Sequence, residues 1–285
     1  MLIYLPSRHR TIALFCSLLL VLAAVHSTQA AQKLFAATGF ASSSGELYIL
    51  NPVDGSIISD VGRLNDAQGK NYSLTGLRYD PSTGLLFGIT GSSPTAPSSL
   101  VIVDQNTALV TYVGGPFSSR LSDIAIQPGT FEIYAISGSS KYFYTIDKTT
   151  GEDTKIGNTL LPPNRGGGFA SNAAGILYGT NDSQLSIYDD VTGEAAAVGN
   201  TNLAFFVGAL AFSPDGLLYG IEGGGTTGMQ LDSDSESVDE SDPDTINETE
   251  TSIRQRWLVI IDSLTGAGIE LGETVGNLNA LAFVP

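Results

Sequence analysis

Asp189-Asp-Val-Thr-Gly-Glu-Ala-Ala-Ala-Val-Gly199 contains a phrase that recurs five times in this chain: a turn ending in Thr-Gly or an equivalent, followed shortly by Val-Gly or a similar pair. The turns end at Gly55, Ala108, Gly151, Gly193 and Gly266, and the later glycines are Gly62, Gly114, Gly157, Gly199 and Gly272. Successive turns are 53, 43, 42 and 73 residues apart. The chain is therefore an internal repeat with a unit of roughly 40 to 45 residues.

Each unit carries four short runs of strand-forming residues. In the second unit these runs are 74–79, 85–89, 100–104 and 109–114, and Gly, Pro, Asn and Asp separate them. Four short antiparallel strands in a unit of this length are typical of one blade of a β-propeller. The longer intervals are explained by an extended loop at 63–73 and an insertion after Ile221. The sequence therefore predicts an all-β fold, a five-bladed β-propeller with four antiparallel strands per blade.

The two ends of the chain complement each other. The last unit stops at Leu281-Ala-Phe-Val-Pro285, and the strand that it lacks is found near the other end as Lys33-Leu-Phe-Ala-Ala-Thr38. We expect the first blade to take its inner strand from the C-terminus and its three outer strands from residues 33–62. Phe35 and Phe283 should then lie in one sheet, which removes the exposed strand edges that an open ring would leave.

The Leu-Ala-Phe runs are the predicted inner strands, because their alternate residues are small and the blades leave least room near the axis. Arg78 in the second blade and Asp123 in the third break this pattern. They lie on neighbouring blades and should form a buried ion pair near the axis, since an unpaired buried charge is costly. A structural role is favoured over ligand binding, although both residues remain candidates for a site.

Residues 1–30 are typical of a secretory signal, with Arg8 and Arg10, an apolar run at 11–25 and small residues before Ala31. The apolar run is shorter than the roughly 20 residues that a membrane span needs. We expect export to the periplasm or the medium, a single domain over 31–285, and no membrane span.

Removal of this signal would take away His9, Cys16 and His26, the only histidines and the only cysteine in the sequence. A Ser-His-Asp triad, a thiolate nucleophile, a histidine-bound metal and a disulfide are thereby excluded from the mature chain. The remaining 11 Lys and Arg stand against 29 Asp and Glu, a net charge of −18. Nucleic acid is an unsuitable partner for such a surface, and we expect neither a cofactor nor a metal site.

Nine of the acidic residues lie between Asp232 and Glu250. The run Asp232-Ser-Asp-Ser-Glu236 begins like a calcium loop, but Ser237 and Pro243 stand where such a loop needs Gly and Glu. The polar composition predicts a disordered acidic insertion over about 223–253. Weak divalent binding by its carboxylates remains the alternative.

Leu210-Ala-Phe-Ser-Pro-Asp-Gly-Leu-Leu-Tyr-Gly-Ile221, with Leu258-Val-Ile-Ile-Asp-Ser-Leu-Thr-Gly266 after the insertion, resembles the repeats of exported bacterial β-propellers of the broad NHL, YVTN and WD40-like group. The resemblance covers essentially the whole mature chain and implies the fold. That group includes binding proteins, scaffolds, lyases and cofactor-bearing dehydrogenases. No catalytic residue is carried over, because the histidines of the lyases and the quinone enzymes have no counterpart here.

Function in propellers tends to lie on variable loops. The variable loops here are those that lead into each inner strand, and the insertion should share their face. The candidate binding residues in these loops are Arg63, Asn65, Asp66, Lys70, Tyr72, Asn164 and Arg165. We expect a monomeric, noncatalytic propeller that binds a protein or an extracellular polymer such as a polysaccharide through this face. The alternatives are a carboxylate-dependent glycoside hydrolase or lyase with its site at the central channel, and a purely structural scaffold.

Overall fold

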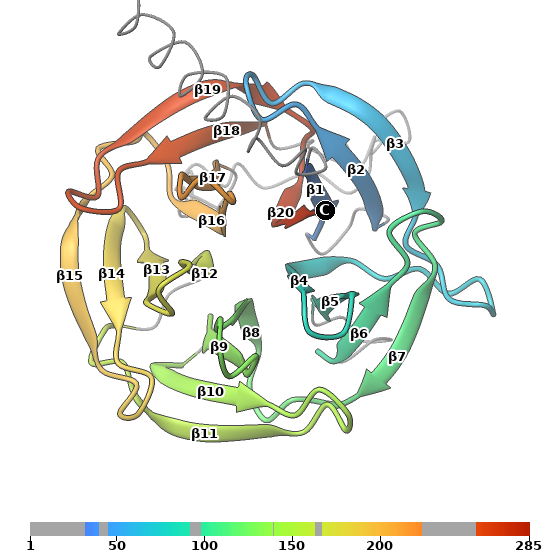
Figure 1. Cartoon of the computed structure of the whole chain (residues 1–285), viewed down its shortest axis with the longest axis horizontal. Coiled ribbons are helices and arrows are strands. Elements are labelled where there is room, and N and C mark those ends of the chain that lie inside the picture. Colours follow the sequence, from blue (N-terminus) through green and yellow to red (C-terminus); the bar gives the residue numbers. More distant parts are fainter. Residues whose placement is uncertain (1–31, 40–44, 92–97, 139, 163–166, 224–254) are drawn as a thin grey trace, which may run out of the picture. The chain divides into compact units, whose positions relative to one another are not determined.

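The computed structural model describes residues 32–39, 45–91, 98–138, 140–162, 167–223 and 255–285. Lys33–Val284 forms one compact unit. Its described elements are all strands, arranged as five separate four-stranded antiparallel sheets in a ring (Figure 1). None of the described residues belongs to a helix long and apolar enough to cross a membrane.

The first two blades, each written from the inner to the outer strand, are β20 (Leu278–Val284), β1 (Lys33–Thr38), β2 (Glu46–Leu50) and β3 (Ile57–Arg63), and then β4 (Leu74–Asp80), β5 (Leu85–Thr90), β6 (Leu100–Val103) and β7 (Val110–Gly114). The third is β8 (Leu121–Ile126), β9 (Ile133–Ser137), β10 (Tyr142–Ile146) and β11 (Asp153–Asn158). The fourth is β12 (Phe169–Ser171), β13 (Leu177–Asn181), β14 (Gln184–Tyr188) and β15 (Ala195–Asn200), and the fifth is β16 (Val207–Phe212), β17 (Leu218–Glu222), β18 (Arg256–Ile261) and β19 (Gly268–Thr274).

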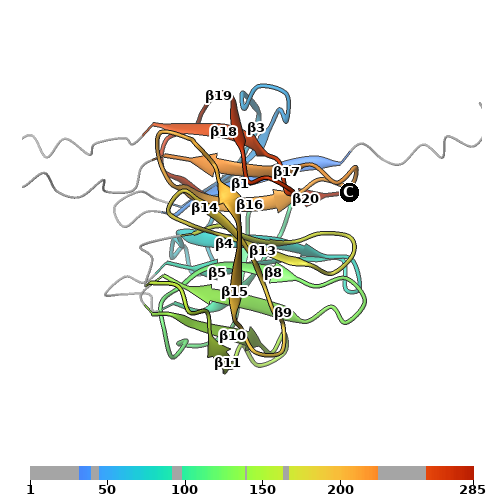
Figure 2. The ribbon, with the colours of Figure 1, turned by 90° about the vertical axis from the view of Figure 1, so that its left-hand side faces the viewer.

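The five-bladed propeller predicted from the repeat is confirmed, and the predicted strands of the second blade match β4 to β7 to within one residue at each end. Seen edge-on in Figure 2, inner strands such as β16 run along the axis of the ring, whereas the outer strand β15 runs nearly across it. Each blade therefore twists from its inner to its outer edge, as antiparallel sheets do.

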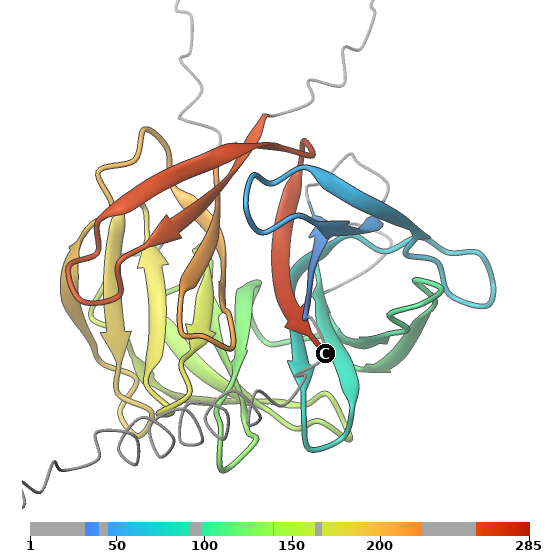
Figure 3. The ribbon, with the colours of Figure 1, turned by 45° about the horizontal axis from the view of Figure 1, so that its top comes forward.

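The first blade joins the two ends of the described chain. β20 pairs with β1, with Leu34 opposite Phe283 and Ala36 opposite Leu281, and Figure 3 shows the red C-terminal strand beside the blue N-terminal one. Phe35 and Phe283 thus lie in one sheet, as predicted. Strands at opposite ends of the sequence close the ring.

Five hydrophobic clusters fill the five interfaces between blades. The cluster between the first and second blades contains Phe35, Leu77 and the small Ala280 and Ala282, whereas Leu281 packs on the opposite side, against the fifth blade. The other three interfaces carry clusters of the same kind. Burial of this apolar surface, at about 25 cal/mol per Å², holds the blades together.

The recurring glycines of the sequence allow the backbones of adjacent blades to approach each other closely. A Cβ placed on Gly157 would lie 1.8 Å from the Thr192 carbonyl oxygen in the turn of the following blade. The same approach occurs at Gly114, Gly199 and Gly272, at 1.7, 1.9 and 2.2 Å from the carbonyls of Thr150, Thr265 and Asp54. At Gly62 the corresponding carbonyl, that of Thr107, is 4.0 Å away. Only glycine allows this approach of two backbones in the four close cases.

Each outer strand also carries a β-bulge at this glycine. The register against the third strand shifts there, so that the residue before the glycine has no partner in the ladder. The side chains that precede the glycines pack into the interface clusters; they are Val61, Val113, Ile156, Val198 and Leu271. A bulge bends a strand and redirects its side chains, which here turns an apolar residue into the blade interface.

The aspartates of the repeated turns accept hydrogen bonds from the backbone of their own turns. Asp147 Oδ1 accepts hydrogen bonds from the backbone N–H groups of Thr149 and Thr150 at 2.7 and 2.8 Å, and these bonds lower the pKa of its carboxyl. Gly151 closes the turn with a φ of 69°, which glycine adopts without strain. Asp189 and Asp262 begin turns of the same design.

Candidate functional site

The centre of the ring is occupied by Arg78, which projects from the inner strand β4. Its Nη2 donates to Asp123 Oδ2 at 3.0 Å. Its two terminal nitrogens also donate to the backbone carbonyl of Leu77 in its own strand. They further donate to one carbonyl on each of the inner strands β12, β16 and β20, those of Phe169, Leu210 and Leu281. One guanidinium thus contacts the inner strands of all five blades.

Asp123, on the inner strand β8, has no exposed surface. Besides Arg78, its Oδ2 accepts from the backbone N–H groups of Phe169 at 2.8 Å and Leu210 at 3.5 Å, and its Oδ1 accepts from that of Ile124 at 2.8 Å. Burial raises the pKa of this carboxyl to about 7, against the opposing influence of Arg78 and the N–H donors. The ion pair that the sequence predicts is present, and every contact of Asp123 is made within the protein.

A hollow of about 440 Å³, open to solvent, lies at the mouth of the channel where the inner strands end, and we call it the central hollow. Arg78 forms part of its wall with Ala170, Ala211 and Ala282, and the remaining lining residues are Tyr79, Ile126, Ser171, Phe212 and Phe283. No carboxylate lines it among the described residues. We call this side of the ring the short-turn face, and the side where the inner strands begin the variable-loop face.

The predicted binding loop at 63–73 forms a compact hairpin whose polar side chains bond to one another. Asp66 Oδ1 accepts from the backbone N–H groups of Gln68 and Lys70, at 3.0 and 2.9 Å, and Asp66 Oδ2 accepts from the Tyr72 hydroxyl at 2.9 Å. Burial and the Asp66 carboxylate raise the pKa of Tyr72 to about 12. Asn71 Nδ2 donates to Asn65 Oδ1 at 2.8 Å. These polar groups hold the hairpin in shape.

The two cations of this hairpin remain accessible. The Lys70 ammonium lies 4.9 Å from the centre of the Tyr72 ring. The Arg63 side chain is 66% exposed and lies 4.0 Å from Glu46, a distance at which a surface ion pair contributes little. The Asn65 carbonyl accepts from the Val110 N–H at 2.9 Å, so the hairpin packs beside the outer strand β7 and away from the central pair of Arg78 and Asp123.

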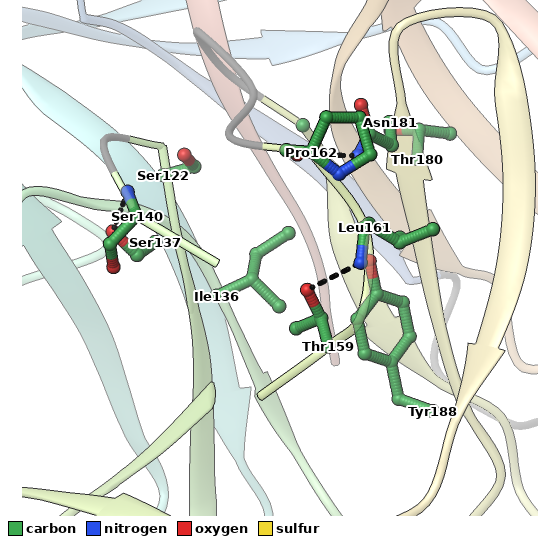
Figure 4. A pocket seen from close by; sticks show the side chains of 11 residues that line it. Ser122, Ile136, Ser137, Ser140, Thr159, Leu161, Pro162, Thr180, Asn181 and Tyr188 are labelled. Atoms are coloured by element: carbon green, nitrogen blue, oxygen red, sulfur yellow. Dashed lines mark hydrogen bonds between the residues drawn. The ribbon is translucent and has the colours of Figure 1, made fainter. Parts of the chain in front are cut away.

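A second hollow, of about 300 Å³ and open to solvent, lies on the variable-loop face between the third and fourth blades (Figure 4). The third blade contributes Ser122, Ile136, Ser137 and Ser140. The fourth blade and the loop that leads into it contribute Thr159, Leu161, Pro162, Gly167, Thr180, Asn181 and Tyr188. We call this hollow the hydroxyl pocket, because hydroxyl groups make up most of its polar lining.

The walls of the hydroxyl pocket are held by hydrogen bonds that reach across the loops. The Ser137 hydroxyl donates to the Arg120 carbonyl at 3.2 Å and lies 2.7 Å from the Ser119 hydroxyl. Asn181 Nδ2 donates to the Pro162 carbonyl at 3.1 Å, and Thr159 Oγ1 accepts from the Leu161 N–H at 3.3 Å; both bonds are drawn in Figure 4.

Sequence reasoning missed the hydroxyl pocket. A signal is present in the loops of the third blade, where Ser118-Ser119 precedes β8 and Ser137 and Ser140 follow β9. Serine is common in any loop, however, and nothing local indicates that these serines meet Thr159 and Tyr188 of the next blade. The predicted binding residues Asn164 and Arg165, and the acidic insertion apart from its edges, lie outside the described residues.

Two carboxyl groups meet beside the edge of that insertion. Glu222, at the end of β17, has no exposed surface, and its Oε1 accepts from the Phe205 N–H at 2.8 Å. Burial and the nearby Glu270 raise the pKa of Glu222. The Phe205 ring stacks on Trp257 at 5.9 Å between centres.

Among the described residues, no group of three or more carboxylate, histidine or cysteine side chains is placed to hold a metal ion.

No protein-family model matches the sequence, and no curated protein matches it. Solved structures share the fold. A chain in the structure of a nidogen/laminin complex has a TM-score of 0.52 and 11% identity, over 89% of this chain and 98% of that one. A Bacteroides caccae protein of unknown function has a TM-score of 0.49 and 13% identity, over 89% and 99%. A virginiamycin B lyase of Staphylococcus aureus has a TM-score of 0.41 and 13% identity, over 62% of this chain and 60% of that one. At 11% identity, the likeness to the chain of the nidogen/laminin complex is one of fold alone.

Proposed function

We propose that this protein is an exported, noncatalytic propeller that binds a protein or an extracellular polymer through its variable-loop face. The observation that carries the proposal is the hydroxyl pocket, a solvent-open hollow with convergent polar groups on that face. Such hollows, built by loops on a rigid scaffold, are the usual form of a binding site.

The noncatalytic assignment follows from the chemistry within reach of the two hollows. Glycoside hydrolysis needs two carboxyl groups facing one pocket. Asp123, on the inner strand β8, is fully buried against Arg78 and backbone N–H groups. The described lining of the hydroxyl pocket contains no carboxylate, histidine or cysteine. Among the described residues, neither hollow offers a general base or a nucleophile activated by one.

The proposal is tested by blocking one face at a time. The chain from Ala31 onward contains no cysteine, so Ser140→Cys in the hydroxyl pocket and Ser171→Cys in the central hollow each introduce a unique thiol. Both serines are half-buried, which makes the second variant a matched control. Each protein is immobilised before and after reaction with a polyethylene-glycol maleimide, and its retention of proteins and polysaccharides from the culture medium of the source is measured.

We expect retention by both unlabelled variants, loss after labelling at position 140, and no loss after labelling at position 171. Retention that survives labelling at position 140, or that is lost only on labelling at position 171, contradicts a binding role for the variable-loop face. Absence of any retention by the unlabelled proteins contradicts the binding function itself.

A further inference from the structure

The guanidinium of Arg78 lies across the axis of the ring. Its terminal nitrogens donate to the carbonyls of Leu77, Phe169, Leu210 and Leu281, which occupy equivalent positions on four of the inner strands that surround the axis in Figure 1. Equivalent carbonyls of successive blades lie at one height along the axis. Because the N–H groups of a guanidinium lie in its own plane, the plane that reaches all four carbonyls is perpendicular to the axis.

One flat face of Arg78 is therefore the floor of the central hollow. Arg78 lines this hollow with Ala170, Ala211 and Ala282, each of which directly follows one of the carbonyl residues. Its terminal N–H groups are taken up by the carbonyls and by Asp123. Its Nε forms no hydrogen bond with a described residue, but it is enclosed by the protein. Arg78 thus offers a ligand its face and not its hydrogen atoms.

The wall above this floor is made of polar backbone groups. The four carbonyl residues direct their backbone groups toward the axis, and backbone groups two residues apart on a strand point to the same side. The residues two further along each strand therefore also direct N–H and C=O groups toward the axis, and all of them line the hollow: Tyr79, Ser171, Phe212 and Phe283. Donors and acceptors thus surround the edge of any group that lies on Arg78.

The hollow has room for a single small ring. About 120 Å³ of it is wide enough to admit a water molecule. A cavity of about 150 Å³ binds benzene, and the central hollow is open at its mouth, where substituents of a ring can extend into solvent. One six-membered ring fits this space, and a larger ligand does not.

A flat cation at the floor selects an aromatic ring over other small groups. The face of an aromatic ring is attracted to a guanidinium, and the attraction is stronger where water is excluded. A carboxylate is less suitable, because Asp123 lies 3.0 Å from Nη2 and neutralises Arg78, and no terminal N–H group remains to bond a carboxylate in the bidentate manner. A saturated ring lacks the negative face that stacking on a cation requires.

From these observations we infer that the central hollow binds one flat aromatic ring with polar groups on its edge, a phenol-like small molecule stacked on the face of Arg78. The backbone groups of the wall hydrogen-bond to the polar edge. This site lies on the short-turn face and takes a free small molecule, so it is separate from the binding role proposed for the variable-loop face.

The test compares three probes: phenol, its saturated counterpart cyclohexanol, and acetate as an anion without a ring. Binding is followed in the full chain by the amide chemical shifts of Ala170, Ala211 and Ala282. Phenol should shift these amides and bind at least about tenfold more tightly than cyclohexanol. The Arg78 Nε–H resonance should move upfield with phenol alone, because a proton beneath an aromatic face is shielded by the ring current.

Arg78 itself is left unchanged in the test, since it also bonds the inner strands together. Ala211→Met instead fills the hollow, because Ala211 has the position in the fifth blade that Arg78 has in the second. This variant should lose phenol binding. Ala196→Met is the matched control, because Ala196 is exposed on the outer strand β15; its affinity for phenol should equal that of the wild type.

Four results overturn the inference: equal affinity for phenol and cyclohexanol, tighter binding of acetate than of phenol, no upfield shift of Arg78 Nε–H, or unchanged phenol binding by folded Ala211→Met. The first three are measured on the wild type, so they decide the matter even if Ala211→Met does not fold. Retention of partners from culture medium bears on the variable-loop face and leaves this result unaffected.

Discussion

Arg78 and Asp123, 45 residues apart in sequence, meet on the axis of the ring with 3.0 Å between Nη2 and Oδ2. The pair does more than neutralise two charges. Arg78 also donates to carbonyls of the inner strands β12, β16 and β20, while Asp123 accepts from the N–H groups of Phe169 and Leu210. One ion pair thus forms hydrogen bonds with backbone groups at the centre of the ring that no strand pairing satisfies.

Arg78→Met is expected to destabilise the propeller strongly, because it leaves the Asp123 carboxylate buried without its cation. The loss in the free energy of unfolding should be about 3 to 5 kcal/mol, measured by denaturant titration. The double variant Arg78→Met with Asp123→Asn should recover part of that loss. A loss below about 1 kcal/mol in the single variant would show that the pair does not hold the centre together.

Ring closure depends on β20, which pairs with β1 along its whole length. A chain ending at Gly272 lacks this strand and exposes both the edge of β1 and the apolar clusters on either side. We expect it to aggregate, or to melt more than about 15 °C below the full chain. Removal of Pro285 alone is the control and should have no effect. Unchanged thermal unfolding of the shortened chain would refute closure by the two ends.

Gly157 should not tolerate a side chain, because its backbone lies against the Thr192 carbonyl. Gly157→Ala forces a methyl group to within 1.8 Å of that oxygen, so the third and fourth blades must move apart, at a cost of about 3 kcal/mol. Gly91→Ala is the control, because its Cβ would meet the Ser73 hydroxyl at 3.3 Å and a side chain can give way. If both variants unfold at the same denaturant concentration, the glycines do not fit the blades together.

Glu222 predicts a pH dependence of stability. Because its pKa is raised in the folded state above the usual 4.5, the folded protein holds this proton more tightly than the unfolded chain does. The free energy of unfolding should therefore fall as the pH rises from 4.5 through the raised pKa. Glu222→Gln, which stays neutral, should be more stable than the wild type at pH values above that pKa.

The difference between wild type and Glu222→Gln should vanish toward low pH, where both side chains are uncharged. Glu270→Gln is the comparison, since it removes the neighbouring charge that contributes to the raised pKa and leaves the burial of Glu222 unchanged. It should reduce the pH dependence without abolishing it. A stability difference between Glu222→Gln and wild type that is constant with pH would exclude Glu222 as its source.

The sequence predicts the architecture well because the repeat is written in local chemistry. Asp147, Thr150 and Gly151 form their turn with each other, so spacing alone reveals the blades. Arg78 and Asp123 are predictable as a pair because each interrupts a row of small residues on an adjacent inner strand. The carbonyl contacts of Arg78 are not predictable, since they depend on how five strands converge.

The functional surface is harder to predict from sequence, for a physical reason. Asp66, Asn71 and Tyr72 have the polar character of binding residues, but they bond to their own loop, as turn residues commonly do. The hydroxyl pocket combines Ser137, Thr159 and Tyr188, from three separate segments that only the completed ring brings together.

Hydrogen–deuterium exchange of the protein with and without the retained partner tests the central claim most directly, because it shows which face the partner covers. Our account predicts slower exchange at Ser137, Ser140 and 159–161, around the hydroxyl pocket, with unchanged exchange at Ala170, Ala211 and Ala282 of the central hollow. Protection confined to the central hollow, with none around the pocket, would contradict it.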